Sequence, residues 1–147
     1  MKISTDKKQK TLRIFICASK YNYCHIASVA KYLKSKGHKI TMPNRYNDPF
    51  FEERMKKISR EKHIQVKRKY LKMQVKKVAK NDVLLIINMT KGKNKNYIGG
   101  STFLEMYKAF EFGKKIFLYN PIPEGAMHDE ITAFNPVVIN GNLDLIK

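Results

Sequence analysis

The residues best suited to chemistry lie near the middle of the chain, in the stretch NYIGGSTFLEMYKAFEFGKK at residues 96–115. One carboxylate there, Glu105, follows a pair of glycines and stands three residues after Thr102. Thr-x-x-Glu is a capping box, in which each side chain binds a backbone amide of the other residue. The alternative is a reactive carboxylate of an active site, kept ionised in the first turn of a helix by the helix dipole. The pattern alone favours the cap.

The glycine pair Gly99-Gly100 indicates a place where a ligand comes close to the backbone. Glycine adopts backbone angles closed to other residues, and the amides at the start of the following helix favour an anion. We therefore expect a cradle for a sugar or a phosphate at this turn. The sequence contains neither the dinucleotide fingerprint GxGxxG nor the P-loop pattern GxxxxGK followed by Ser or Thr, so no cofactor of either kind is expected.

The apolar pattern alternates between strand and helix along the chain. Short runs rich in branched and aromatic residues predict strands at residues 12–18, 38–42, 82–88, 114–120 and 137–139. Helical spacing predicts a helix that ends at Gly37, one long helix or two shorter ones over 51–79, and a helix from about Thr102 to Phe112. A short helical turn is expected before the fifth strand. This order predicts one three-layer α/β domain over residues 1–147, Rossmann-like or flavodoxin-like, with a mostly parallel five-stranded sheet and a flexible basic tail at residues 1–10.

Three loops should meet at one edge of this sheet. Ligands of open α/β sheets bind in the crevice beyond the carboxyl ends of the strands. The loops that leave strands at that edge are residues 19–23, 88–101 and 120–128. We expect them to converge on one site, with Glu105 at the mouth of the sheet.

The chain is strongly basic. Thirty Lys and Arg against twelve Asp and Glu give a formal charge of +18, which predicts attraction to polyanions and a strong dependence of such contacts on salt. A phosphate-bearing partner and a solvated coat of lysines explain this charge equally well, because charge reports on association and not on fold.

Twelve of the basic residues fall in the segment that begins at Arg54 and ends at Lys80, where Glu61 is the only acid. Its apolar residues keep helical spacing, which is typical of a basic amphipathic helix. Such a helix binds nucleic acid, lies on an anionic membrane, or forms the solvated face of a helix packed on the sheet. The last interpretation is favoured, because a helix that covers a sheet needs a polar outer face, and Tyr70 is the only aromatic residue here that could stack on a base.

The sequence gives no sign of membrane insertion or secretion. The longest uncharged apolar run, residues 83–87, is too short to cross a bilayer, and the start of the chain lacks the pattern of a signal peptide. Cys17 and Cys24 show neither CxxC nor metal-ligand spacing, and the four histidines are scattered. We therefore expect a cytoplasmic protein with reduced thiols, no metal and no membrane partner.

Three ordered motifs carry a resemblance to a known family: DVLLIIN at residues 82–88, YIGGSTFLEMYKA at 97–109 and GKKIFL at 113–118. This succession of strand, glycine turn, glutamate and helix resembles the nucleoside 2-deoxyribosyltransferase-like superfamily. The segments NPIPE and PVVINGNLD extend the resemblance, which covers the first strand and, more firmly, residues 82–144. By this resemblance, Glu105 is the family's catalytic glutamate.

The resemblance implies a reaction and a set of binding residues. In the family, the glutamate attacks the anomeric carbon of a deoxyribose and forms a covalent sugar–enzyme intermediate, which a second base or water resolves. A carboxylate suits this role because it neutralises an oxocarbenium-like transition state before it bonds to carbon. The implied catalytic residue is Glu105, and the implied substrate-binding residues are Ser19, Lys20, Tyr21, Asn88, Gly99, Gly100, Ser101, Thr102 and His128.

The chain departs from the family at two places. Family members carry an acid shortly before the glutamate, where Gly99 stands here, and a second about two helical turns before the third strand, where Gln74 stands. The second acid helps to protonate the leaving base, and the candidates to replace it are Asp48, Glu52 and His128. The family also completes its sites across subunit contacts, which implies a homodimer or larger assembly here, with residues 121–128 as the donated segment.

Two functional hypotheses follow. The first is an enzyme that needs no cofactor and cleaves or transfers the N-glycosidic bond of a nucleoside or its 5′-monophosphate. The second is a catalytically inactive nucleotide- or nucleic-acid-binding module, with residues 54–80 as the nucleic-acid contact. Release of free base from a panel of deoxynucleotides separates the two, because the second predicts stabilisation by ligand without product.

Overall fold

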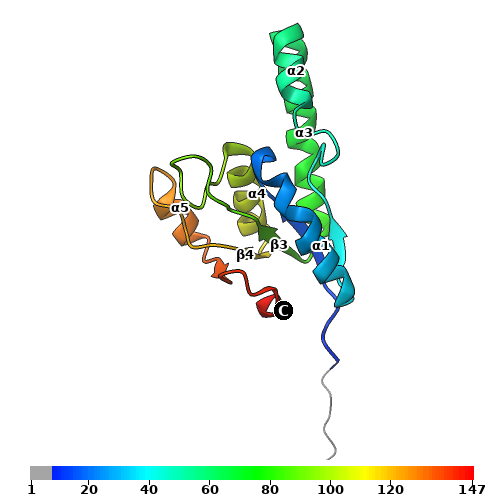
Figure 1. Ribbon diagram of the computed structural model, residues 1–147, viewed down its shortest axis with the longest axis vertical. Helices are drawn as coiled ribbons and strands as arrows, with labels where there is room; N and C mark the ends of the chain where they lie inside the picture. The colour runs from blue at the N-terminus through cyan, green and yellow to red at the C-terminus, as the bar shows by residue number, and fades with distance from the viewer. Residues whose placement is uncertain (1–7) are drawn as a thin grey trace, which may run out of the picture.

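The computed structural model describes residues 8–147, which form one parallel sheet between two layers of helices (Figure 1). The strands are β1 (Arg13–Cys17), β2 (Lys39–Thr41), β3 (Val83–Ile86), β4 (Lys115–Leu118) and β5 (Val137–Val138). The helices are η1 (Lys20–His25), α1 (Ile26–Ser35), α2 (Phe51–Ile58), α3 (Arg60–Lys80), α4 (Gly100–Glu111), α5 (His128–Ala133) and η2 (Leu143–Leu145). All strand pairs are parallel, in the order β2-β1-β3-β4-β5. The predicted three-layer α/β fold is confirmed.

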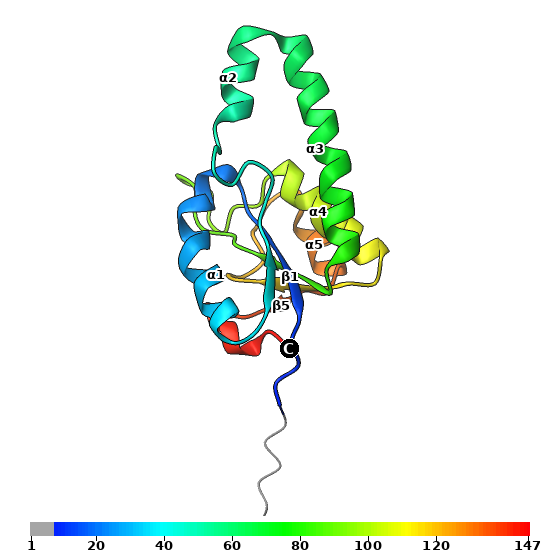
Figure 2. The ribbon, with the colours of Figure 1, turned by 90° about the vertical axis from the view of Figure 1, so that its right-hand side faces the viewer.

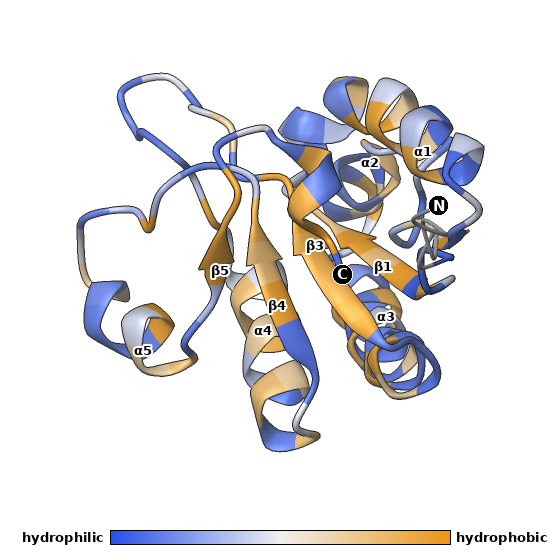
Figure 3. Cartoon of the chain, turned by 90° about the horizontal axis from the view of Figure 1, so that it is seen from below, coloured by the Kyte–Doolittle hydropathy of each residue, from blue (hydrophilic) through white to orange (hydrophobic). Residues whose placement is uncertain are grey.

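Both faces of the sheet are covered, which explains why its strands are apolar throughout. Side chains of a strand alternate between the two faces. In β1, Ile14 and Ile16 join the core beneath α1, whereas Phe15 and Cys17 join the core beneath α3, α4 and α5. Figure 3 shows the apolar strands at the centre of the molecule.

The basic segment forms two helices. The chain breaks at Ser59, whose backbone is extended, and the Ser59 side chain accepts a hydrogen bond of 3.2 Å from the amide of Lys62. This cap starts α3. The C-terminal part of α3 packs on the sheet through Val78, whereas α2 buries none of its residues. Together α2 and α3 form a helical hairpin that extends beyond the carboxyl edge of the sheet (Figure 2).

The predicted elements differ from the observed ones mainly at their ends. The 3₁₀ helix η1 at residues 20–25 takes up most of the loop expected at residues 19–23, and α4 begins at Gly100 rather than near Thr102. Of the expected tail, residues 1–7 lie outside the described residues. No helix within residues 8–147 is long and apolar enough to cross a membrane.

The strand order places a crevice at the carboxyl ends of β1 and β3. The chain runs from β1 to β2 on one side and then returns to β3 on the other side of β1. The loops that leave β1 and β3 therefore turn in opposite directions, which opens the space between them for a ligand.

Candidate active site

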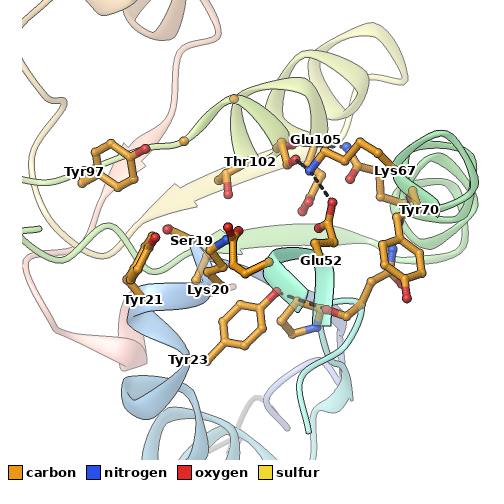
Figure 4. A pocket seen from close by; sticks show the side chains of 18 of the residues that line it. Ser19, Lys20, Tyr21, Tyr23, Glu52, Lys67, Tyr70, Tyr97, Thr102 and Glu105 are labelled. Carbon is orange, nitrogen blue, oxygen red and sulfur yellow. Dashed lines mark hydrogen bonds and ion pairs between the residues drawn. The ribbon is translucent and has the colours of Figure 1, made fainter. Parts of the chain in front are cut away.

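A cavity of about 340 Å³ occupies this crevice and is roofed by the α2–α3 hairpin. The loop after β1 and the first turns of α4 line one side of the cavity, and residues of α2 and α3 line the other (Figure 4). Most of the expected site residues line it together: Ser19, Lys20, Tyr21, Gly99, Gly100, Ser101, Thr102 and Glu105.

Glu105 is a buried carboxylate with an unused oxygen. It lies on α4 next to the core residues Met106 and Ala109 in the sequence of that helix, and it is only 8% exposed. Within the described residues, Glu105 Oε2 has no hydrogen-bond partner, although the side chain lines the cavity. A buried polar atom left without a partner is costly and points to a role beyond folding.

The expected capping box is wrong. The N-cap of α4 is Gly99, and no side chain caps this helix. Because the helix begins two residues earlier than expected, Thr102 lies inside its first turn and Glu105 in its second, and both are buried. The structure therefore assigns the carboxylate no capping role.

The expectation that the helix dipole keeps Glu105 ionised is also wrong. Burial raises the pKa of Glu105 from 4.5 to about 7, because a charged carboxylate loses its hydration there. The Cys17 thiol and the ammonium groups of Lys77 and Lys67 oppose this rise without cancelling it. Near pH 7, the carboxyl group is thus poised between its two protonation states, a property common among catalytic acids and bases.

Lys67 of α3 ties the hairpin to the glycine turn. Its Nζ donates a hydrogen bond of 2.7 Å to Ser101 Oγ and lies 3.4 Å from Glu52 Oε1 of α2. Glu52 Oε1 also lies 3.2 Å from His63 Nε2, and Gln74 Nε2 donates to the Ser101 carbonyl at 3.2 Å. Figure 4 shows Glu52, Lys67 and Glu105 coming together from α2, α3 and α4. The interpretation of this segment as a solvated face therefore fails for Lys67.

Four ammonium groups surround the cavity, from Lys20, Lys56, Lys67 and Lys91. Lys20 forms an ion pair with Glu53, and the pKa of Lys20 is lowered by burial and then by the nearby charge of Lys56. Lys91 Nζ lies 3.9 Å from the ring centre of Tyr21 and 4.6 Å from that of Tyr97. With the amides that begin α4, this arrangement favours an anionic ligand that also presents a flat face to the tyrosines.

Two expected site residues lie elsewhere. Asn88 is buried and donates hydrogen bonds of 3.0 and 3.1 Å to the carbonyls of Asn120 and Pro121, while its Oδ1 accepts one of 2.9 Å from the Asn120 amide. These hydrogen bonds link the ends of β3 and β4, and Asn88 does not line the cavity. His128 begins α5 and lines a second cavity of about 640 Å³, and no residue of the loop at 120–128 lines the cavity of Glu105.

Among the three candidate acids, only Glu52 lines the cavity with Glu105. Asp48 instead forms an ion pair with Arg54 on the surface. The sequence carries one further signal for this wall of the cavity. Lys67, Tyr70 and Gln74 recur at three- and four-residue steps, so they share one helix face, and all three line the cavity.

Within residues 8–147, no group of three His, Cys, Asp or Glu is placed to hold a metal ion.

Comparison of the chain with protein-family models, curated proteins and solved structures finds no match.

Proposed function

We propose that this cavity binds a nucleoside or nucleoside 5′-monophosphate and that Glu105 attacks its sugar to cleave or transfer the N-glycosidic bond. The observation that carries the proposal is the buried Glu105 carboxylate, which lines the cavity and whose Oε2 has no hydrogen-bond partner in the described chain. The motif resemblance to the nucleoside 2-deoxyribosyltransferase-like superfamily points to the same residue.

In the proposed reaction, ionised Glu105 bonds through a carboxylate oxygen to the anomeric carbon while the bond from that carbon to the base breaks. The bonding electrons leave with the base nitrogen, which takes up a proton. Water or a second base then attacks the anomeric carbon, displaces Glu105 and completes hydrolysis or transfer. Because burial raises the energy of the free carboxylate, bonding to a cationic carbon relieves a cost already present in the folded protein.

Glu52 and His63 are our candidates for the proton relay to the leaving base. Glu52 lines the cavity opposite Glu105, and its Oε1 lies 3.2 Å from His63 Nε2. Imidazole and carboxylate groups are the common general acids and bases of enzymes, and this pair lies within hydrogen-bonding distance. Lys20, Lys91 and the amides at the start of α4 would hold a 5′-phosphate, whereas Tyr21 and Tyr97 offer ring faces to the base.

A nucleotide-binding module without turnover is the second candidate. One observation favours it: the position of the family's leaving-group acid is held by Gln74, whose amide donates a hydrogen bond of 3.2 Å to the Ser101 carbonyl and cannot act as a general acid. The same cavity would then bind the nucleotide and leave it intact.

Base release decides between these candidates. Deoxynucleosides and their 5′-monophosphates are incubated with the protein, free base is measured by chromatography, and binding is followed as a rise in melting temperature. Glu105→Gln should lower turnover by orders of magnitude with binding retained, whereas Glu111→Gln, at the exposed far end of α4, should leave turnover unchanged. For the active protein, kcat/KM should rise with pH through about 7, as Glu105 ionises. Stabilisation by ligand without any base release would establish the binding module.

A further inference from the structure

The outer face of α3 carries a row of cations. Successive residues of an α-helix are about 100° apart, so residues 65, 68, 69, 72 and 76 lie on the side opposite 67, 74 and 78. The inner side faces the cavity and the core through Lys67, Gln74 and Val78. The outer side faces solvent, and a shallow groove of about 430 Å³ there is lined by Gln65, Arg68, Lys69, Lys72, Met73 and Lys76. We name Arg68, Lys69, Lys72 and Lys76 the outer stripe.

The outer stripe is uncompensated. All four side chains belong to exposed residues, and none forms an ion pair within residues 8–147. The ion pairs that α3 does make come from His63 and Lys67, which point inward to Glu52. The only acid on α3, Glu61, lies in its first turn. Lys67 is thus paired with an acid inside the protein, whereas the four cations of the outer stripe have no acidic partner among residues 8–147.

The spacing of the stripe suits a polymer of phosphates. Lys72 and Lys76 follow Arg68 at four-residue steps, which places successive cations about 6 Å apart along a straight rod. The 21 residues of α3 make this rod about 31 Å long, and its N-terminal part extends beyond the sheet in Figure 2. We propose that the outer stripe binds the phosphate backbone of a nucleic acid, independently of its sequence.

The composition of the helix decides between backbone, bases and membrane. The one aromatic residue of α3, Tyr70, lies on the inner side, where its hydroxyl accepts from Arg45 Nε, so the stripe offers no ring for base stacking. The exposed apolar residues Ile64 and Met73 are nine positions apart and so lie on opposite sides of the helix. No continuous apolar face remains to enter a bilayer. Contacts between cations and phosphates are what the surface supports.

The test measures binding of the full chain to a labelled DNA duplex and to a single-stranded RNA of about 20 nucleotides by fluorescence anisotropy, between about 50 and 200 mM salt. One variant combines Arg68→Gln, Lys69→Gln, Lys72→Gln and Lys76→Gln. The matched control also removes four positive charges, by Lys31→Gln, Lys34→Gln, Lys36→Gln and Lys39→Gln, all at exposed residues of α1, its C-cap and the start of β2. Circular dichroism checks that both variants fold.

Wild-type protein should bind at least one of the two polymers. The stripe variant should lose at least tenfold in affinity, with a slope of log K against log salt smaller by about 3 to 4, because each lost phosphate contact removes up to about 0.9. The control should stay within about threefold of the wild type. Equal losses in both variants would overturn the proposal in favour of net charge alone. The proposal would also be overturned if the protein bound anionic vesicles and bound neither the DNA duplex nor the RNA. Base release from the cavity should not differ between the variants, so this proposal and the proposed function fail separately.

Discussion

Replacing Glu105 by Gln should make the protein more stable at alkaline pH. In the folded state burial raises the pKa of Glu105 to about 7, against an ordinary value of 4.5. The folded protein therefore holds this proton more tightly than the unfolded chain does. The stability contribution of a group with a raised pKa is present at low pH and is lost as the pH rises from about 4.5 through 7. Gln has the shape of the protonated side chain and does not ionise, so the variant does not lose this stability as the pH rises.

The size of the effect follows from the two pKa values. Each pKa unit corresponds to 1.36 kcal/mol, so a change from 4.5 to about 7 corresponds to about 3 kcal/mol at pH 8 and above. At pH 5 the group is mostly protonated in the folded protein, and the difference should fall below about 1 kcal/mol. Urea unfolding at both pH values gives the free energy of unfolding for wild type and Glu105→Gln.

Glu111→Gln supplies the control, because Glu111 is an exposed carboxylate on the same helix that pairs with Lys108. Its loss should change stability little and almost equally at the two pH values. A stabilising role for Glu105 would give the opposite sign. A loss of about 1 kcal/mol for Glu105→Gln at both pH 5 and pH 8, the size typical of a lost cap, would refute the burial reasoning.

Two further predictions concern the thiols and the sheet edge. Cys17 is fully buried and its pKa is raised by burial and by the charge of Glu105, whereas Cys24 is exposed. At pH 8 a thiol reagent should therefore modify Cys24 rapidly and Cys17 only in denaturant. Rapid modification of both would contradict the packing of β1. Asp82 accepts hydrogen bonds of 2.8 Å from the amide and 2.7 Å from the guanidinium of Arg13, which lower its pKa to about 2. Asp82→Asn should cost about 1 kcal/mol or less at pH 7, since the pair is partly exposed, and the difference should disappear as the pH falls from about 4 towards 2 in unfolding experiments.

The sequence determined the strands and the fold class, because these depend on local patterns. The run DVLLIIN has no polar position that could face water, so it predicts a strand covered on both sides, and β3 is buried along its whole length. Gly113, with its positive φ, follows the end of α4 as the pattern predicted. The glycine turn and the loop after β1 were also placed at one edge of the sheet from their order alone, and they line one cavity.

The tertiary structure decided which of those residues do what. Asn88 looked free at a strand end, yet the register of β3 against β4 brings it to the backbone of Asn120. Glu105 matched a capping box, but the helix starts earlier and packing of α4 buries the carboxylate, which raises its pKa. Lys67 and Lys69 are alike in the sequence, and only the docking of α3 directs the first into the cavity and leaves the second in solvent. Local sequence sets backbone preference, whereas burial, partners and protonation arise from segments that meet only when the chain has folded.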